Sequence, residues 1–378
     1  MNPKPLSHRR PICLSACLIP PLLALAGCGG TRATDAQAPG AYIGDTDVGR
    51  DSLREAVEPL FDPDVEHSSG ETRAVIVLHD GKVVAERYAP GFTAETKHLS
   101  WSVAKTVTAV LVGIMVSDGR LSLDEPVPVP AWRHGADPRG AITLRQMLTM
   151  SSGIEHNENK GPLENTDTLR MLVGDGAGDM AAYAESKPLA QAPGKEFLYS
   201  SATTLILSDM LTRMLTNSER PQDRRDAMMR FIQQRLIEPV GLKSLTPEFD
   251  AHGTMVGGAF IHMTAMDYAR LGEMLRRGGL ARGRQIVSQR WVQFMTRPSA
   301  AKEGYGGHVW LNRPGSEKIM FVDDAARSVF AANGLRGQYV IVSPAQGLTI
   351  VRLGVTSDEE LPVLRERLGR ILRKFPGG

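Results

Sequence analysis

The sequence predicts an α+β fold, in which one antiparallel sheet is flanked by helices and joined to an inserted, mostly helical lobe. Three observations lead to this prediction. Strand-like apolar alternation occurs near both ends of the chain, helical segments fill the middle, and one wholly apolar helical segment lies between the first strands and that middle region. With 378 residues, of which 42% are hydrophobic, the chain is long enough to bury one large core.

Two strands joined by a tight turn are expected to begin the sheet. A helix over 51–61 precedes them, and the apolar alternation that follows is interrupted by Asp80-Gly81, a strong two-residue hairpin signal. We therefore predict strands at 73–79 and 82–88, within a folded region that spans 51–376.

A buried helix is predicted next, over 102–116. This segment is almost wholly apolar, and Lys105 is its only charged residue. A helix without a polar face is typically surrounded by other elements on all sides. Asp118-Gly119 ends the pattern.

The helical lobe is expected at about 118–250, where helical segments alternate with loops that contain Gly and Pro. Beyond the lobe, Thr264 is a plausible N-cap for a helix that runs to about Arg277. The remaining segments return to the sheet and close on a helix. The predicted lobe helices are 144–150, 166–173, 203–216 and 224–236, the late strands are 306–312, 339–342 and 348–353, and the closing helix is 359–374.

The first residues resemble an export signal. Positive residues precede an apolar run over 11–26, and the run ends in Leu25-Ala26-Gly27-Cys28, a pattern that resembles the bacterial lipobox. We expect a lipoprotein signal peptide at 1–27, lipidation of Cys28 and a flexible tether at 28–50. An ordinary signal peptide cut nearby is the alternative, and a single membrane-spanning anchor is disfavoured because Pro20-Pro21 breaks a short run.

Gly29 follows the cysteine in place of the Asp that favours retention in the inner membrane in lipoproteins of this type. The resemblance therefore implies an exported, membrane-anchored lipoprotein, facing the periplasm from the outer membrane if the organism has one. The other cysteines, Cys13 and Cys17, would leave with the signal, so the mature chain is expected to form no internal disulfide.

Composition limits the classes of partner. The formal net charge is +2, and the basic residues are scattered rather than gathered in a stripe, which argues against a nucleic-acid partner and favours a small-molecule substrate. The nine histidines show no metal-ligand spacing, and no dinucleotide or phosphate-loop motif occurs. We expect neither a metal nor a cofactor.

Ser102 and Lys105 form a Ser-x-x-Lys pattern at the start of the apolar helix. Residues three apart share a helix face, and burial lowers the pKa of an amine, so neutral Lys105 could accept the proton of a nucleophilic Ser102. The backbone N–H of Ser102, free at a helix start, could donate to an oxyanion. Ser299-Ala300-Ala301-Lys302 fits the same pattern, but it lies in a Gly-rich loop without an apolar helix, and we interpret it as chance.

Tyr199, in Tyr199-Ser200-Ser201, is the third candidate, because a phenol near this pair could relay protons. Packing of a half-buried tyrosine is the alternative. His308, on a predicted strand, is expected to be a packing residue rather than a functional one.

In order and spacing, these motifs resemble the serine β-lactamase and penicillin-recognising family. The resemblance covers about 70–355 and is greatest to the class C-like branch, with its esterase and 6-aminohexanoate-dimer hydrolase members. The esterase and 6-aminohexanoate-dimer hydrolase members have sequence motifs like Gly119-Arg120-Leu121-Ser122-Leu123-Asp124, Met147-Leu148-Thr149-Met150-Ser151-Ser152-Gly153 and Gly334-Leu335-Arg336-Gly337-Gln338 of this chain.

The resemblance implies an acyl-enzyme mechanism in which Ser102 attacks a carbonyl and Lys105 and Tyr199 move protons. It also implies that the backbone N–H of Gln338 completes the oxyanion hole with that of Ser102. Ser201 stands where the family often has Asn, and Leu335 stands where it usually has Lys or His two residues before the Gly that matches Gly337. Arg336 would then have to replace that cation.

We therefore predict a serine hydrolase that cleaves an ester, amide or peptide-like bond, with Ser201, Arg336 and Gly337 binding the substrate. Turnover of β-lactams is less expected than that of esters or amides, because the cation that would hold their carboxylate is displaced. The alternatives are a penicillin-binding or cell-wall-binding lipoprotein of low turnover and a purely structural lipoprotein.

Overall fold

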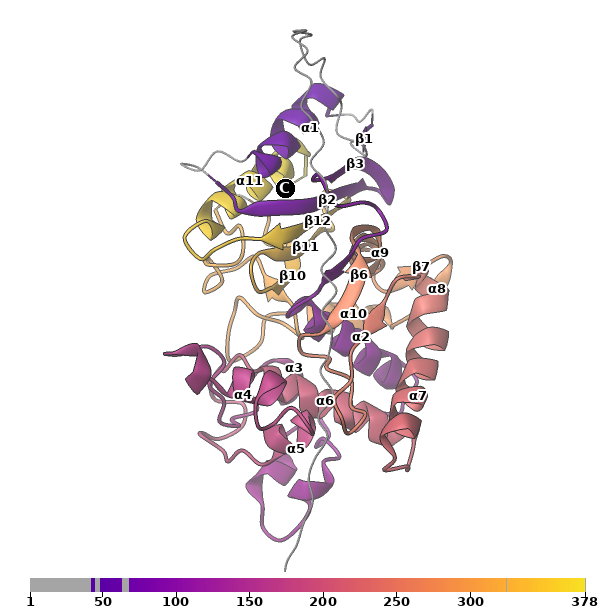
Figure 1. Cartoon of the computed structure of the whole chain (residues 1–378), viewed down its shortest axis with the longest axis vertical. Coiled ribbons are helices and arrows are strands. Elements are labelled where there is room, and N and C mark those ends of the chain that lie inside the picture. The colour runs from indigo at the N-terminus through magenta and orange to yellow at the C-terminus, as the bar shows by residue number, and fades with distance from the viewer. Residues whose placement is uncertain (1–41, 45–47, 63–67, 324, 378) are drawn as a thin grey trace, which may run out of the picture. The chain divides into compact units, whose positions relative to one another are not determined.

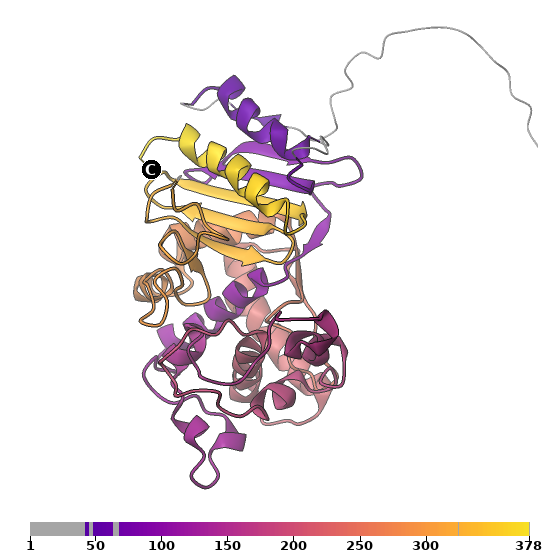
Figure 2. The same cartoon turned by 90° about the vertical axis from the view of Figure 1, so that its left-hand side faces the viewer.

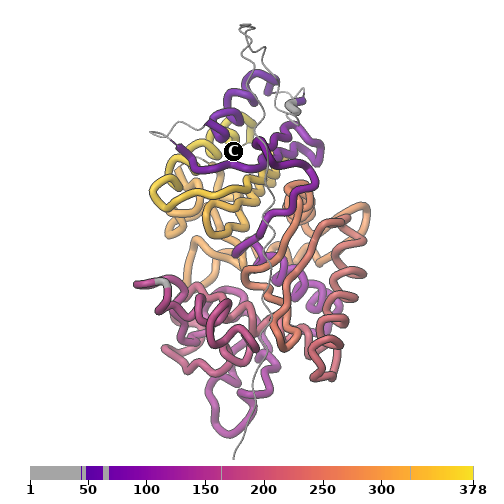
Figure 3. Tube along the Cα trace, in the orientation of Figure 1, coloured from indigo at the N-terminus to yellow at the C-terminus, as the bar shows by residue number. Residues whose placement is uncertain are grey.

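A seven-stranded antiparallel sheet unites the two ends of the folded chain. The computed structural model describes residues 42–44, 48–62, 68–323 and 325–377. The strand order is β1-β3-β2-β12-β11-β10-β9, so early strands lie beside late ones (Figures 1 and 3). The strands are β1 (Tyr42–Ile43), β2 (Glu71–His79), β3 (Lys82–Tyr88), β9 (Trp310–Leu311), β10 (Phe330–Gly334), β11 (Gln338–Ser343) and β12 (Leu348–Val355).

Both faces of this sheet are covered, which explains why its central strands are apolar almost without interruption. In β2, Val75 and Val77 face a core shared with α1 (Arg50–Val57) and α11 (Leu361–Lys374). Ile76, which points the other way, belongs to the main core. Figure 2 shows α11 lying across the strands.

Helix α9 (Ala265–Arg276) packs against the opposite face, over β11 and β12. The approach is close at Gly272, where a Cβ atom would lie 2.6 Å from the side chain of Thr349 and 2.8 Å from that of Val340. Only glycine fits there without displacing the strand residues.

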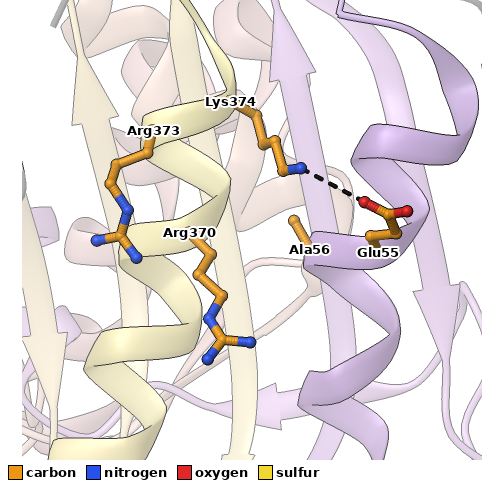
Figure 4. Close-up of a pocket in the computed structure, with 5 residues that line it drawn as sticks. All are labelled: Glu55, Ala56, Arg370, Arg373 and Lys374. Atoms are coloured by element: carbon orange, nitrogen blue, oxygen red, sulfur yellow. Dashed lines mark ion pairs between the residues drawn. The ribbon is translucent and has the colours of Figure 1, made fainter.

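Helices α1 and α11, from opposite ends of the folded chain, lie side by side. Lys374 Nζ lies 3.6 Å from Glu55 Oε2 across the groove between them, and Arg370 and Arg373 line the same groove (Figure 4). These arginines pair with Glu366 on their own helix, at 2.7 Å and 3.4 Å. The packing of α1 on α11 rests mainly on buried apolar residues of both helices.

The mostly helical lobe contains the predicted helices and several short turns. Helix α2 (Val103–Ser117) links it to the sheet and is buried from Val103 to Met115. A five-residue π-helix over Gln233–Ile237 follows α7. The other helices are α3 (Leu144–Leu148), α4 (Asp167–Val173), α5 (Met180–Glu185), α6 (Ser201–Leu215), α7 (Pro221–Ile232), α8 (Glu238–Val240) and α10 (Gln289–Met295).

The structure adds strands that the sequence analysis did not predict. A small sheet has the order β4-β6-β5, from β4 (Lys97–Leu99), β5 (Thr246–Pro247) and β6 (Ile261–Thr264), and β7 (Leu280–Ala281) pairs with β8 (Arg284–Gln285). The strand expected at 306–312 is only two residues long. The α+β prediction is confirmed. The short strands were not predicted because they depend on distant partners and have little periodicity of their own.

The predicted signal peptide, Cys28 and most of the predicted tether lie outside the described residues. Within the part of the chain that the structure describes, no helix combines the length and apolar character needed to cross a bilayer.

Candidate active site

Ser102 lies at the N-cap of α2, where a strained turn presents it to a cavity. Trp101, directly before it, adopts a left-handed conformation with φ of 45°, which is costly for a bulky residue. Ser100 anchors the turn, because its Oγ donates to the Ala259 carbonyl at 2.9 Å. Among the described groups, none accepts a hydrogen bond from the Ser102 backbone N–H, so this donor is available to a ligand.

Lys105 lies one turn further along α2 and is completely buried, with 1% of its side chain exposed. Its Nζ lies 3.0 Å from Ser102 Oγ, 2.9 Å from Ser201 Oγ and 2.9 Å from the Gly258 carbonyl oxygen. Burial lowers the pKa of Lys105 to about 8, although the carboxylate of Glu158 opposes this shift. A substantial fraction of the amine is therefore neutral near pH 8 and can accept the proton of Ser102.

Tyr199 covers the other side of this pair. Its ring lies 4.9 Å from Lys105 Nζ and stacks on Trp310 at 5.8 Å between ring centroids. Burial raises the pKa of the Tyr199 phenol well above its ordinary value, and Glu158 raises it further, while the contact with Ser102 opposes both. The Tyr199 phenol is therefore neutral near neutral pH, which leaves Lys105 as the candidate base.

Ser201 begins α6 and connects Lys105 to a carboxylate. Its Oγ donates to Glu158 Oε1 at 2.6 Å, and its backbone N–H donates to Glu158 Oε2 at 2.7 Å. His156 Nε2 lies 2.8 Å from the same Oε2. Glu158 Oε1 is 4.0 Å from Lys105 Nζ, so the carboxylate and the amine also interact directly.

Ser102, His156, Glu158, Tyr199 and Ser201 line one cavity of about 580 Å³, large enough for a small organic molecule. Its surface is mostly apolar, with Ser102 and Ser201 at one wall. The aromatic and aliphatic part of the lining consists of Trp101, Leu172, Phe197, Leu198, Tyr199, Ala259, Trp310, Ile319 and Leu335.

The hairpin between β10 and β11 contributes different residues from those expected. Asn333 and Leu335 line the cavity, and Arg336, Gly337 and Gln338 do not. The left-handed turn explains the difference, because Arg336 has φ of 60° and is exposed to solvent.

Gly337 and Gln338 instead contact α11 and strand β12, respectively. A Cβ atom on Gly337 would lie 2.7 Å from Leu364 of α11. The side-chain amide of Gln338 exchanges hydrogen bonds with the backbone of Gly354 in β12, at 2.7 Å and 3.0 Å. The substrate-binding role expected for Arg336 and Gly337, and the oxyanion role expected for Gln338, therefore have no support from the cavity's lining.

The second Ser-x-x-Lys copy lies outside this cavity. Ser299 Oγ donates to the Lys302 carbonyl at 3.1 Å, and Lys302 Nζ lies 5.0 Å above the ring of Phe197. Neither side chain forms a serine–amine contact like that of Ser102.

His308 is buried and held on both ring nitrogens, at 2.8 Å from the Leu148 carbonyl and 3.1 Å from Thr204 Oγ1. Burial lowers its pKa to about 3, so the ring is neutral. This geometry is that of a packing residue. In the described ranges, no cluster of three or more His, Cys, Asp or Glu side chains is arranged to hold a metal ion.

Sequence reasoning missed Glu158, His156 and Trp310. Glu158 and His156 lie in the loop between α3 and α4, which has no periodic pattern. Glu158 bonds to Ser201 across 43 residues of sequence, and His156 contacts Glu158. Ser152-Gly153, just before them, belongs to a motif that indicates the family but not a partner for Lys105. A local signal for a partner of Lys105 is absent from this segment.

The family model described as "Beta-lactamase" matches residues 57–370. The 6-aminohexanoate-dimer hydrolase of Paenarthrobacter ureafaciens is 26% identical over an alignment of 310 residues that covers 79% of this chain and 76% of that protein.

Solved structures of the same fold include a penicillin-binding protein homologue from Caulobacter crescentus, with a TM-score of 0.64 and 17% identity over 88% of this chain and 99% of that one. A family VIII carboxylesterase has a TM-score of 0.61 and 15% identity, over 85% of this chain and 97% of that one. These likenesses confirm the predicted fold.

Proposed function

Because the chain belongs to the beta-lactamase family, we propose that it is a serine hydrolase that cleaves an ester or amide bond through an acyl-enzyme on Ser102. The observation that carries this proposal is the 3.0 Å contact between Ser102 Oγ and the buried Nζ of Lys105. A nucleophile beside an amine of lowered pKa is the arrangement that activates a serine without a histidine.

In the first half-reaction, neutral Lys105 takes the proton of Ser102 as Oγ bonds to the substrate carbonyl carbon. The tetrahedral intermediate collapses when the bond to the leaving group breaks, and the protonated Lys105 gives that group its proton, directly or through Tyr199. Water then attacks the acyl carbon and gives a proton to the same, now neutral, amine. This proton passes to Ser102 Oγ as the acyl bond breaks, which releases the acid and restores the Ser102 hydroxyl.

The oxyanion is expected to accept hydrogen bonds from the backbone N–H groups of Ser102 and Leu335. We favour Leu335 over Gln338 because it lines the cavity, whereas Gln338 is buried in β11. The end of β10 abuts the nucleophile's turn, since a Cβ atom on Gly334 would lie 2.4 Å from the Ser100 carbonyl oxygen. Two such donors stabilise the charge that develops on the carbonyl oxygen.

The lining favours a substrate whose acyl part is neutral and apolar. Among the described residues that line the cavity, Lys160 is the only lysine or arginine, and it is exposed at the rim. Lys105 is buried and does not line the cavity, and its amine is engaged by three partners. Glu158 adds a negative charge to the same wall. A carboxylate in the acyl group would therefore lose its hydration without gaining a cation in return.

A matched pair of activated esters tests this proposal. We expect p-nitrophenyl butyrate to have a kcat/KM at least about tenfold higher than p-nitrophenyl hemisuccinate, whose acyl chain ends in a carboxylate. Equal values, or a preference for the hemisuccinate, would contradict the assigned substrate class. An adduct that forms with either ester but does not turn over would instead favour the low-turnover binding protein.

We also propose that Cys28 anchors the mature chain to a membrane, on the sequence pattern alone. Metabolic labelling with an alkyne fatty acid is expected to mark the wild-type protein and a Cys17→Ser control, and to leave Cys28→Ser unlabelled. Labelling that survives in Cys28→Ser would overturn the anchor.

A further inference from the structure

Glu158 makes no contact that the proposed reaction itself requires, yet it is ion-paired or hydrogen-bonded on both carboxylate oxygens and is only 17% exposed. Burial of a carboxylate is costly, and its several donors offset that cost. They also hold the pKa of Glu158 below its ordinary value, because Lys105, His156 and Ser201 together outweigh the effect of burial. Glu158 is therefore ionised beside the amine.

An ionised carboxylate can only accept hydrogen bonds, and this fixes the direction of its bond with Ser201. The Ser201 hydroxyl must therefore donate its one hydrogen to Glu158 Oε1, at 2.6 Å. Its oxygen is then an acceptor for Lys105, at 2.9 Å.

The carbonyl of Gly258 is the second obligate acceptor at Lys105, also at 2.9 Å. In the neutral amine, the two N–H bonds are thus committed to Ser201 and Gly258. The nitrogen lone pair is left to face the remaining neighbour, Ser102 Oγ at 3.0 Å. This orientation is the one in which an amine can accept the serine proton.

We propose that Glu158 is a positioning residue, which orients the base through Ser201 and supplies the negative charge that sets the protonation of Lys105. The carboxylate also accepts a hydrogen bond from the Ser201 backbone N–H at the start of α6, where a negative charge is favoured. His156 Nε2, at 2.8 Å from Oε2 and 3.1 Å from Thr168 Oγ1, fixes the carboxylate from the opposite side. The inference rests on the proposed hydrolase function.

The other ionisable groups that face Lys105 leave Glu158 as the dominant charge. Tyr199, before α6, is a neutral phenol because burial raises its pKa. His308, before β9, is neutral above about pH 4 because burial lowers its pKa to about 3. His156 contacts the carboxylate rather than the amine.

The charge of Glu158 raises the pKa of Lys105. A nearby carboxylate favours the ammonium form, so its removal lowers the pKa of Lys105 and increases the neutral fraction at a given pH. In Glu158→Gln, the acid limb of the kcat/KM profile should move to lower pH by about one to three units. The plateau should fall by about 10- to 100-fold, because the Ser201 hydroxyl can then donate to Lys105 and compete with Ser102.

The experiment measures kcat/KM for p-nitrophenyl butyrate against pH in the full chain, with thermal unfolding to verify each variant's fold. Asp167→Asn is the matched control, since Asp167 anchors the same loop through the Asn157 backbone N–H at 2.7 Å but does not contact Lys105. This control is expected to keep the wild-type midpoint. Glu158→Asp retains the charge and should also keep that midpoint, with a lowered plateau.

An unchanged midpoint in folded Glu158→Gln would overturn the inference, even if the plateau falls. If Glu158→Gln does not fold, the inference is tested with Glu158→Asp. A midpoint of the kcat/KM profile that differs from the wild-type value in Glu158→Asp would overturn the inference. An inactive wild-type chain would instead refute the proposed function, so the two failures are distinguishable.

Discussion

Replacement of Ser102 by Ala is expected to reduce the hydrolysis of p-nitrophenyl butyrate by about 10⁴-fold or more. The variant keeps the cavity, its aromatic walls and Lys105, but it has no oxygen at the position from which the carbonyl carbon is attacked. Because Ser102 is at a helix start and half-buried, the fold should tolerate loss of one oxygen atom. Initial rates at matched protein concentration measure the effect.

Ser299→Ala is the matched control, because it removes the serine of the second Ser-x-x-Lys copy in the same chain. That serine bonds within its own loop and has no amine partner. The control should retain the wild-type rate. Activity retained in Ser102→Ala, or lost equally in both variants, would contradict the assignment of the nucleophile.

Replacement of Lys105 by Met is expected to lower kcat/KM by about 10³-fold or more, since proton transfer by a positioned group contributes about 10²- to 10⁴-fold. Met is close to Lys in length and apolar, so it fills the buried space without a base. In the wild type, the rate should rise with pH through a midpoint near 8, as burial lowers the pKa of Lys105 to about 8 and the deprotonated amine is the active form.

Lys302→Met serves as the control for the loss of a lysine. The wild-type rise near pH 8 should survive in Lys302→Met and disappear from the residual activity of Lys105→Met. A rise with the same midpoint in Lys105→Met would show that another group is the base.

Local pattern was sufficient to predict the centre of the candidate site. The apolar run after Ser102 predicted a helix buried on all sides, and α2 is buried from Val103 to Met115. Burial is what distinguishes Lys105 from Lys302, and it can be anticipated from neighbouring residues alone. The hairpin at Asp80-Gly81 was equally local, and its two strands were predicted within about two residues.

The remainder of the site depends on contacts between distant segments. Glu158 meets Ser201 through a loop without periodicity, and Trp310 reaches Tyr199 from a two-residue strand. At the β10–β11 hairpin, the family pattern predicted Arg336, but the left-handed turn exposes its side chain and directs Leu335 to the cavity. Backbone twist in a turn of this kind is a property of the folded hairpin and cannot be derived from residue spacing.

The central claim is that a covalent acyl-enzyme forms on Ser102. Intact-protein mass spectrometry after rapid mixing with p-nitrophenyl butyrate, followed by peptide mapping, tests it most directly. We predict one added butyryl group, on the peptide that contains Ser102, which decays as turnover proceeds and is absent from Ser102→Ala. Turnover without an adduct in quenched samples, or an adduct on a different residue, would contradict it.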